Sequence, residues 1–308
     1  MVLAATGLAV GHAAVVTHNT LPSVVFAIVD LIVVAIVARY LTNAGVLDFP
    51  LSRSASANLV ATRGNRLPSL WLVAHIDSKS QTIPMLVRIA AVALFTVSLA
   101  IVLIAGAAMT VVQADNVQHT LAGAAHVSSI VLIASALPLI FCFIGNRSNG
   151  ALDNATGVAA VLLAARDSSS ENFGVIITSA EELGLAGAHA FARANRDQGT
   201  AINCDTVDDN GRFLLMRSKA PSAYVHEAVM RAADRAGIPA GGFRRMLPGV
   251  LADNVAFSAA GWDSFTVARG NLRTLSRVHT SGDRADSISG TGIAQAALLI
   301  AAIVEELS

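Results

Sequence analysis

The stretch WLVAHIDSKSQ, residues 71–81, places two chemically capable side chains beside an apolar segment. A run of four apolar residues leads into His75 and Asp77, and polar residues follow for a few positions. Shortly afterwards the chain becomes apolar for most of sixty residues. A short apolar run next to turn signals is typical of a buried strand. The stretch therefore predicts a strand over 69–75 that ends in a His-x-Asp pair, directly before a segment with membrane character.

Charge is scarce and unevenly distributed along the chain. Of the 308 residues, 54% are hydrophobic and 14% are charged, whereas soluble domains carry about 25% charged residues. The segment 1–38 contains one charged residue, Asp30, and the segment 89–146 contains one, Asp115. From Asn149 onward the composition is that of an ordinary globular protein. We therefore expect a soluble domain with membrane segments attached or inserted.

Three segments are long enough to cross a bilayer, which takes about 20 mainly apolar residues. They are Pro22–Leu41, Ile89–Val112 and Ala122–Ile144, and a short polar loop at 113–120 joins the last two into a hairpin. The expected organisation is an N-terminal membrane region over 1–48, a catalytic domain formed by 49–84 and 148–308, and an inserted transmembrane hairpin over 85–147. The alternative is a set of three buried helices in a soluble protein. An acid inside a membrane segment is costly, so Asp30 is a candidate for function or for a partner contact.

The distribution of arginine predicts which side of the membrane the catalytic domain occupies. The loop at 113–121 has no Lys or Arg, whereas Arg39, Arg88 and Arg147 stand at the opposite ends of the three segments. Cytoplasmic flanks carry the excess of positive charge. We therefore expect an integral membrane protein, in the cell membrane, whose catalytic domain faces the cytoplasm.

The remaining sequence alternates between strand and helix patterns. Strands are expected over 58–63, 69–75, 173–179, 200–205 and 264–270, with an edge strand over 213–218, and helices are expected within 150–166, 181–195, 223–237 and 288–307. This alternation predicts an α/β sheet covered on both faces. Functional sites in such sheets form beyond the carboxyl ends of the strands.

Acidic and imidazole side chains gather at those predicted strand ends. They are His75 with Asp77, Asp153 at the mouth of a helix, Glu181 with Glu182, Asp205, and His279. Each motif alone has an ordinary structural explanation, such as a helix cap or a favourable charge at a helix start. Together they would repel one another at one rim of the sheet unless a cation lies among them.

Charge balance favours two divalent ions. Asp153, Glu182 and Asp205 supply three negative charges, two Zn²⁺ supply four positive charges, and a bridging hydroxide brings the cluster close to neutral. Carboxylate and imidazole ligands without thiolate suit catalytic zinc. Asp77 can accept the ring N–H of His75, and one of the adjacent glutamates can bind metal while the other serves as general base.

The ordered motifs AHIDS, GALDNATGVAAVL, SAEELGLAGAHAF, INCDTVD and VHTSGDRADSI resemble those of the di-zinc aminopeptidase family, which includes bacterial leucyl aminopeptidases and relatives of glutamate carboxypeptidase. The resemblance covers about 58–80 and 149–307. It implies a three-layer α/β/α zinc-exopeptidase fold around a mixed sheet, with two Zn²⁺ per chain. It also implies these roles: His75 and Asp205 bind one zinc, Glu182 and His279 bind the other, Asp153 bridges them, Asp77 orients His75, and Glu181 is the general base.

Two departures from the family pattern stand out. The first motif and the bridging aspartate usually lie a short loop apart, but here 76 residues and the predicted hairpin separate Asp77 from Asp153. A segment that usually contains Ser-Asp-His contains Ala252, Asp253 and Asn254. That segment lies near the substrate pocket in relatives, so the resemblance leaves specificity open.

The expected function is that of a membrane-anchored di-zinc exopeptidase, with an aminopeptidase favoured, that cleaves short peptides through a metal-bridged hydroxide with Glu181 as general base. The alternatives are a carboxypeptidase, for which Arg244, Arg245 and Arg269 could clamp a substrate carboxylate, a deacylase, a glutaminyl cyclase-like enzyme, a catalytically silent scaffold, or part of a transporter. Its expected partners are a peptide substrate and the lipid bilayer. The net charge of zero and the lack of a basic tract exclude a nucleic-acid partner.

Overall fold

The computed structural model describes Ile32 and residues 55–64, 68–112, 114–195, 199–246 and 250–308. Apart from Ile32, the predicted N-terminal membrane region 1–48, with its segment Pro22–Leu41 and Asp30, lies outside the described residues. The described residues form two compact units. Ile32 and the described residues of Leu86–Phe143 belong to a helical unit, and those of Leu41–Met85 and Ile144–Ser308 form a sheet domain.

The sheet domain is built on a mixed sheet. In the described part of the chain it has seven strands, in the order β1-β5-β2-β6-β9-β7-β8. Their bounds are β1 Leu59–Arg63, β2 Leu70–His75, β5 Phe173–Thr178, β6 Thr200–Val207, β7 Arg212–Arg217, β8 Ala240–Arg245 and β9 Asp263–Gly270. Neighbours from β5 through β9 are parallel, β1 and β7 pair antiparallel to their inner neighbours, and β8 is parallel to β7. All residues of β2 and β5 are buried because both faces of the sheet are covered.

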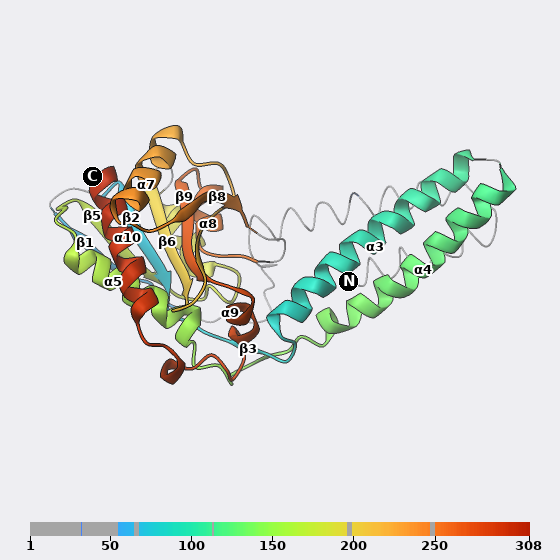
Figure 1. Ribbon diagram of the computed structural model, residues 1–308, viewed down its shortest axis with the longest axis horizontal. Coiled ribbons are helices and arrows are strands. Elements are labelled where there is room, and N and C mark those ends of the chain that lie inside the picture. The colour runs from blue at the N-terminus through green and yellow to red at the C-terminus, as the bar shows by residue number, and fades with distance from the viewer. Residues whose placement is uncertain (1–31, 33–54, 65–67, 113, 196–198, 247–249) are drawn as a thin grey trace. The chain divides into compact units, whose positions relative to one another are not determined.

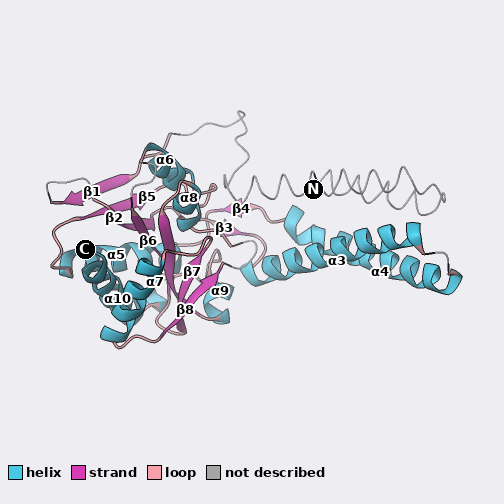
Figure 2. Ribbon diagram, turned by 90° about the horizontal axis from the view of Figure 1, so that it is seen from above, coloured by secondary structure: helices cyan, strands magenta, loops and turns pink. Residues whose placement is uncertain are grey.

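Helices cover the two faces of the sheet, as Figures 1 and 2 show. One face carries α5 (Thr156–Asp167), α7 (Ala223–Arg235) and α10 (Thr291–Leu307), and the other carries α6 (Ala186–Ala194) and α8 (Asn254–Ala259). A short helix, α9 (Leu272–Arg277), follows β9. On the first of these faces, apolar side chains at helical spacing are fully buried in the core between the helices and the sheet. Examples are Ala160 and Ala164 in α5 and Ile300 and Ile303 in α10. This three-layer α/β arrangement places the carboxyl ends of β2, β5, β6 and β9 at one edge.

One detail of the predicted sheet is wrong. The predicted strand at 213–218 forms, as β7, but it lies between β9 and β8 instead of at the edge. The true edge strand on that side is β8, with the sequence AGGFRR. Adjacent glycines and two arginines give it no apolar alternation, so its sequence did not predict a strand.

The helical unit consists of α3 (Met85–Val111) and α4 (Asp115–Ile140), which run side by side in Figures 1 and 2. The polar loop predicted at 113–120 is largely wrong, because α4 already begins at Asp115. The side-chain amide of Gln118 donates hydrogen bonds to the carbonyl oxygens of Met109, at 2.8 Å, and Val112. A polar side chain at the tip therefore satisfies carbonyls that the end of α3 leaves free.

Both helices have the length and composition of membrane spans. Among the described residues, Met85–Met109 and Asp115–Ile140 are long and apolar enough to cross a bilayer, with 25 and 26 residues. Large apolar side chains on them, including Leu94, Ile104 and Ile130, are more than half exposed. Two such helices are weak evidence for a membrane span, because length and composition alone define them.

Candidate metal centre

The seven residues predicted to form the site meet at the carboxyl edge of the sheet. His75 is the last residue of β2, and Glu181 and Glu182 lie in the turn that follows β5. Asp205 lies inside β6, two residues before its end and at an irregularity in its pairing with β9, whereas the sequence predicted that the strand ends at Asp205. His279 follows α9 and has a φ of 61°, a backbone conformation that residues other than glycine seldom adopt.

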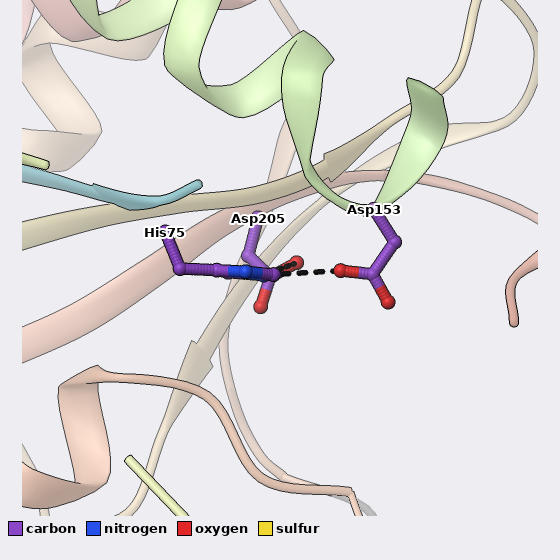
Figure 3. Close-up of side chains that lie close together, drawn as sticks. All are labelled: His75, Asp153 and Asp205. Carbon is purple, nitrogen blue, oxygen red and sulfur yellow. Dashed lines mark ion pairs between the residues drawn. The ribbon is translucent and has the colours of Figure 1, made fainter. Parts of the chain in front are cut away.

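Asp153 lies at the centre of this group, with its two oxygens directed toward different histidines. Its Oδ1 lies 3.0 Å from Nε2 of His75, and its Oδ2 lies 3.0 Å from Nε2 of His279. On the first side, Oδ1 of Asp205 lies 3.8 Å from the same nitrogen of His75, as Figure 3 shows. On the second side, Oε1 of Glu182 lies 2.9 Å from Nε2 of His279. Two three-residue clusters therefore share one carboxylate.

The donor atoms fit a pair of metal ions. Within each cluster the ligand atoms all lie within 4.8 Å of one another. Nε2 of His75, Nε2 of His279 and Oε1 of Glu182 are buried and make no hydrogen bond of ordinary geometry within the described structure. Buried polar atoms nearly always have a partner. Imidazole nitrogen and carboxylate oxygen are ligands that zinc takes in catalytic sites, so the residues present suit zinc.

The backbone around Asp153 is held by its neighbour Asn154. Asp153 has φ −126° and ψ 85° inside the irregular turn η1 (Ala151–Ala155), so this residue does not continue a helix. The Asn154 side chain donates to the carbonyl of Cys204 at 2.9 Å and accepts from the N–H of Thr206 at 3.2 Å. Its oxygen also accepts from the N–H of Gly157, where a Cβ would lie 2.4 Å from the Cys204 carbonyl oxygen. These contacts fix the bridging residue against the end of β6.

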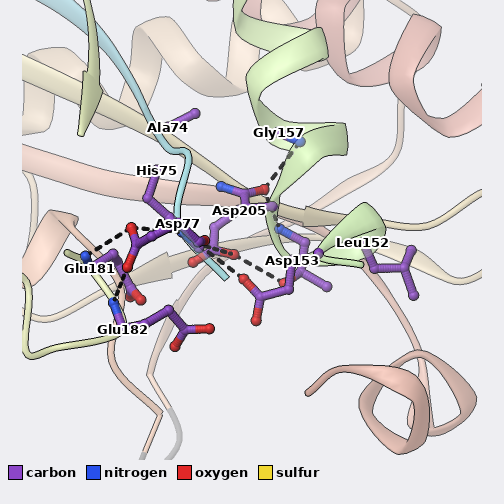
Figure 4. A network of polar contacts seen from close by, with 12 residues as sticks. Ala74, His75, Asp77, Leu152, Asp153, Gly157, Glu181, Glu182 and Asp205 are labelled. Carbon is purple, nitrogen blue, oxygen red and sulfur yellow. Dashed lines mark hydrogen bonds and ion pairs between the residues drawn. The ribbon is translucent and has the colours of Figure 1, made fainter. Parts of the chain in front are cut away.

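The carboxylate of Asp77 makes different contacts from the one that the sequence predicted. The strand β2 ends at His75, so Asp77 falls outside it. The ring Nδ1 of His75 lies 3.0 Å from the backbone carbonyl oxygen of Asp77 and 3.7 Å from its carboxylate. The carboxylate instead accepts the backbone N–H groups of Glu181 and Glu182, both at 3.1 Å, as Figure 4 shows. The residue thus orients His75 through its backbone and the glutamate turn through its side chain.

The surroundings of Glu181 and His75 raise the pKa of both side chains. Burial raises the pKa of the Glu181 carboxyl well above its usual range, against the attraction of His75, and neighbouring carboxylates including Asp205 add to the rise. Burial opposes the charged form of His75, yet the carboxylates of Glu181 and Asp153 raise the pKa of the imidazole well above its usual value. A carboxyl whose pKa rises toward neutrality suits a general base.

Lys79 is a site residue that sequence reasoning missed. Its ammonium Nζ lies 2.5 Å from Oε2 of Glu182, on the opposite side of that carboxylate from His279. The side chain of Lys79 is 15% exposed, so it lies largely inside the site. Lys79 stands within the stretch that predicted the strand, but a single lysine after a strand has no motif that would have identified it.

Asp253 also joins the site, from the segment that departs from the family pattern. It is fully buried, and one oxygen accepts a hydrogen bond from the hydroxyl of Thr178. Burial and the carboxylates of Asp205 and Asp77 raise the pKa of Asp253 to about 6, against the attraction of His75. The neighbouring Asn254 is buried as well, but its side-chain oxygen accepts from the hydroxyl of Thr266 at 2.9 Å.

The three arginines considered as carboxylate clamps have other surroundings. The guanidinium of Arg269 lies over the ring of Phe213, 5.3 Å from its centroid. Arg244 and Arg245 are exposed on the edge strand β8. These contacts give no support to a carboxypeptidase clamp.

Comparison with known proteins identifies relatives of the chain. The model of peptidase family M28 matches residues 107–304. The chain is similar in structure to an aminopeptidase from Aneurinibacillus sp. strain AM-1, with 16% identity and a TM-score of 0.52 over 81% of this chain and 47% of that one. It is also similar to the LapA aminopeptidase of Legionella pneumophila, with 13% identity and a TM-score of 0.50 over 82% of this chain and 59% of that one.

At these identities the two similarities establish the fold alone. A zinc aminopeptidase from Bacillus subtilis shares 26% identity, with a TM-score of 0.45 over 53% of this chain and 43% of that one. The chain thus spans about half of the length of the solved structures that it matches. No curated protein matches it significantly.

Proposed function

The chain belongs to peptidase family M28, and from that membership we propose that it is a membrane-anchored exopeptidase of the aminopeptidase type with two zinc ions per chain. The observation that carries the proposal is the pair of buried three-residue clusters that share Asp153. One cluster adds His75 and Asp205, and the other adds Glu182 and His279. In this proposal the five residues are the metal ligands, Glu181 is the general base, and Asp77 positions His75 and Glu181.

The chemistry of the site follows from these assignments. Zinc ions held by the clusters would polarise the scissile carbonyl and lower the pKa of a bound water molecule to about 7. Glu181 would accept a proton from the attacking water at its carboxylate and return it to the leaving amine. Asp77 accepts the backbone N–H of Glu181, and the Glu181 carboxyl interacts electrostatically with His75 and Asp205 of the ligand cluster. The backbone carbonyl of Asp77 can only accept, so Nδ1 of His75 donates to it, and Nε2 would be the ligand atom once a metal is bound.

The excess of carboxylates supports cleavage beside a free amino terminus. Asp77, Glu181 and Asp253 bring three further carboxyl groups to this edge, beside the three in ligand positions, and Lys79 is already paired with Glu182. Opposite charges attract most strongly where water is excluded, so this edge of the sheet favours a substrate ammonium over a substrate carboxylate. A substrate profile distinguishes this proposal from the alternatives, which are a carboxypeptidase, a deacylase, a glutaminyl cyclase-like enzyme and a silent scaffold.

Anchoring in the membrane rests on α3 and α4. Their exposed apolar side chains would face lipid in a bilayer, where burial of apolar surface lowers the free energy. The stretch 113–121 has no Lys or Arg, whereas Arg88 and Arg147 stand at the other ends of the hairpin. By the positive-inside rule the proposed catalytic domain faces the cytoplasm.

The test is a combined metal and substrate assay on the full chain in mild detergent. We expect bound zinc and hydrolysis of aminoacyl anilides and dipeptides, with N-acetylated dipeptides left intact. Glu181→Gln should keep zinc and lose about 10²-fold or more in kcat, since a general base contributes that much. The matched control is Glu227→Gln, which alters an exposed glutamate on α7. A metal-free protein, or cleavage of the acetylated substrates alone, would overturn the proposal.

A further inference from the structure

The inserted hairpin leaves and re-enters the sheet domain through a small ribbon. The strand β3 (Ser80–Gln81) pairs antiparallel with β4 (Ile144–Gly145). The N–H of Arg147 also donates to the hydroxyl of Ser80 at 2.8 Å. We call residues 80–81 and 144–149 the hairpin base. The two chain ends of the insertion are therefore joined inside the sheet domain, before α3 begins and after α4 ends.

The hairpin base is bonded to the segment that begins with the ligand candidate His279. The N–H of Gln81 donates to the backbone carbonyl of His279 at 2.9 Å. The N–H of Asn149 donates to the carbonyl of Asp283 at 3.3 Å, and the hydroxyl of Ser148 donates to its carboxylate at 3.3 Å. His279 has a positive φ, which persists only where surrounding contacts hold the residue. The hairpin base supplies one of those contacts.

Asp283 connects the hairpin base to the bridging carboxylate. Its side chain is fully buried, and its Oδ1 accepts the N–H of Leu152 at 2.5 Å. Its Oδ2 accepts the N–H of Asp153 at 3.3 Å in addition to the hydroxyl of Ser148. A buried carboxylate is costly unless it is hydrogen-bonded, so these contacts fix the carboxylate and the backbone around Asp153 to each other. The carboxylate of Asp283 thus contacts the shared ligand Asp153 at the backbone N–H of Asp153.

We propose that Asp283 is a positioning residue that holds Asp153 in place to bridge two metal ions and couples it, through Ser148 and Asn149, to the base of the inserted hairpin. Asp283 does not itself contact the metal ions or the substrate. The inference rests on the proposed metal centre. It predicts that metal affinity depends on a hydrogen-bond chain that runs from the hairpin base to Asp153.

The test replaces Asp283 with asparagine in the full chain in detergent, since asparagine keeps the size of the side chain but removes its charge and one acceptor. The measurements are the zinc dissociation constant, by competition with a chromophoric chelator, and the visible absorption of the Co²⁺-loaded protein. We expect zinc to bind about 10–100-fold more weakly and the Co²⁺ spectrum to change, as is usual when the partner of a ligand is lost. The control is Asp286→Asn, which alters an exposed carboxylate in the same segment that pairs with Arg284; it should leave both readouts unchanged.

Ser148→Ala provides a milder variant at the hairpin base. It removes the hydroxyl that contacts Asp283 and Gly150, and it should weaken zinc binding in the same direction by a smaller factor. This variant decides the question if Asp283→Asn does not fold, and melting of the metal-free protein reports folding for each. A lower melting temperature with unchanged zinc affinity and Co²⁺ spectrum would overturn the inference. If the unaltered chain binds no zinc, the proposed function fails instead.

Discussion

The carboxylate of Asp77 accepts the backbone N–H of Glu181 at 3.1 Å, although 104 residues separate the two in the chain. The other oxygen of the same carboxylate accepts the N–H of Glu182. The end of β2 therefore holds the turn after β5, where the proposed base and a proposed ligand lie side by side. His75, by contrast, depends on the backbone of Asp77 for its ring orientation.

This relationship predicts the effect of Asp77→Asn. An amide keeps the backbone carbonyl that contacts His75, so zinc content should stay close to that of the unaltered chain. One of the two N–H contacts to the glutamate turn is lost, so kcat should fall about 10–100-fold with a smaller change in KM. Steady-state kinetics and elemental analysis of the same sample check this. Loss of one zinc ion per chain with the remaining activity per metal unchanged would show that the carboxylate acts on His75 after all.

Lys79 and zinc compete for the charge of Glu182, which predicts the effect of Lys79→Met. Removal of the ammonium leaves the Glu182 carboxylate without its cation in the metal-free protein, which should lower that protein's melting temperature. The ligand cluster also becomes more negative, so zinc should bind more tightly. The increase in melting temperature on adding zinc should therefore be larger than in the unaltered chain.

Lys219→Met is the control for that comparison. Lys219 donates to the carbonyl of Ser258 at 2.7 Å and has no contact with Glu182 among its described hydrogen bonds. Its replacement should leave the zinc-dependent increase unchanged. Equal increases in both variants would contradict an electrostatic role of Lys79.

The raised pKa of Asp253 predicts that the stability of the metal-free protein depends on pH. Its pKa in the folded chain, about 6, exceeds the ordinary value of 3.8 because burial disfavours the charged form. The folded state therefore holds this proton more tightly, and stability from this group falls as the pH rises from below 4 through 6. Asp253→Asn stays neutral, so above pH 7 it should be more stable than the unaltered chain by about 3 kcal/mol. The advantage should vanish near pH 4. Thermal melts in EDTA at several pH values measure it, and a pH-independent difference would refute the assignment.

The hairpin base defines where the insertion can be removed. Replacement of residues 82–143 by a two-residue Asn-Gly turn keeps β3, β4 and the contacts of Ser148 and Asn149 with Asp283. We expect this shortened chain to bind zinc as the full chain does. A cut that also removes β4 should weaken zinc binding, because it breaks the ribbon and frees Gln81. Equal zinc affinity in both shortened chains would contradict a role for the ribbon.

The sequence predicted the ligand candidates because they lie where strand patterns end. Parallel strands place their carboxyl ends at one edge, so His75, Glu182 and Asp205 could be expected to meet without knowledge of the packing. Asp153, at the mouth of a helix, and His279 were identified with them as acidic and imidazole candidates, and the ordered family motifs implied their roles. The same pattern reasoning predicted a helix-covered α/β sheet, and the family resemblance implied that it is mixed.

The parts that escaped prediction depend on backbone geometry and long-range packing. The carboxylate of Asp77 bonds to N–H groups of a turn more than a hundred residues away, and Asp283 bonds to N–H groups around Asp153. Side-chain spacing carries no information about such contacts. The edge strand β8 was missed because its sequence, AGGFRR, has neither β-branched residues nor apolar alternation.

The most direct test of the shared metal centre is the zinc content of the purified chain, measured by elemental analysis beside Asp153→Ala. The account predicts about two zinc ions per chain in the unaltered protein, as in other paired-metal hydrolytic sites. It also predicts a large loss of both ions in the variant, because both clusters use the same carboxylate. Fewer than one ion in the unaltered chain, or two ions retained without Asp153, would contradict it.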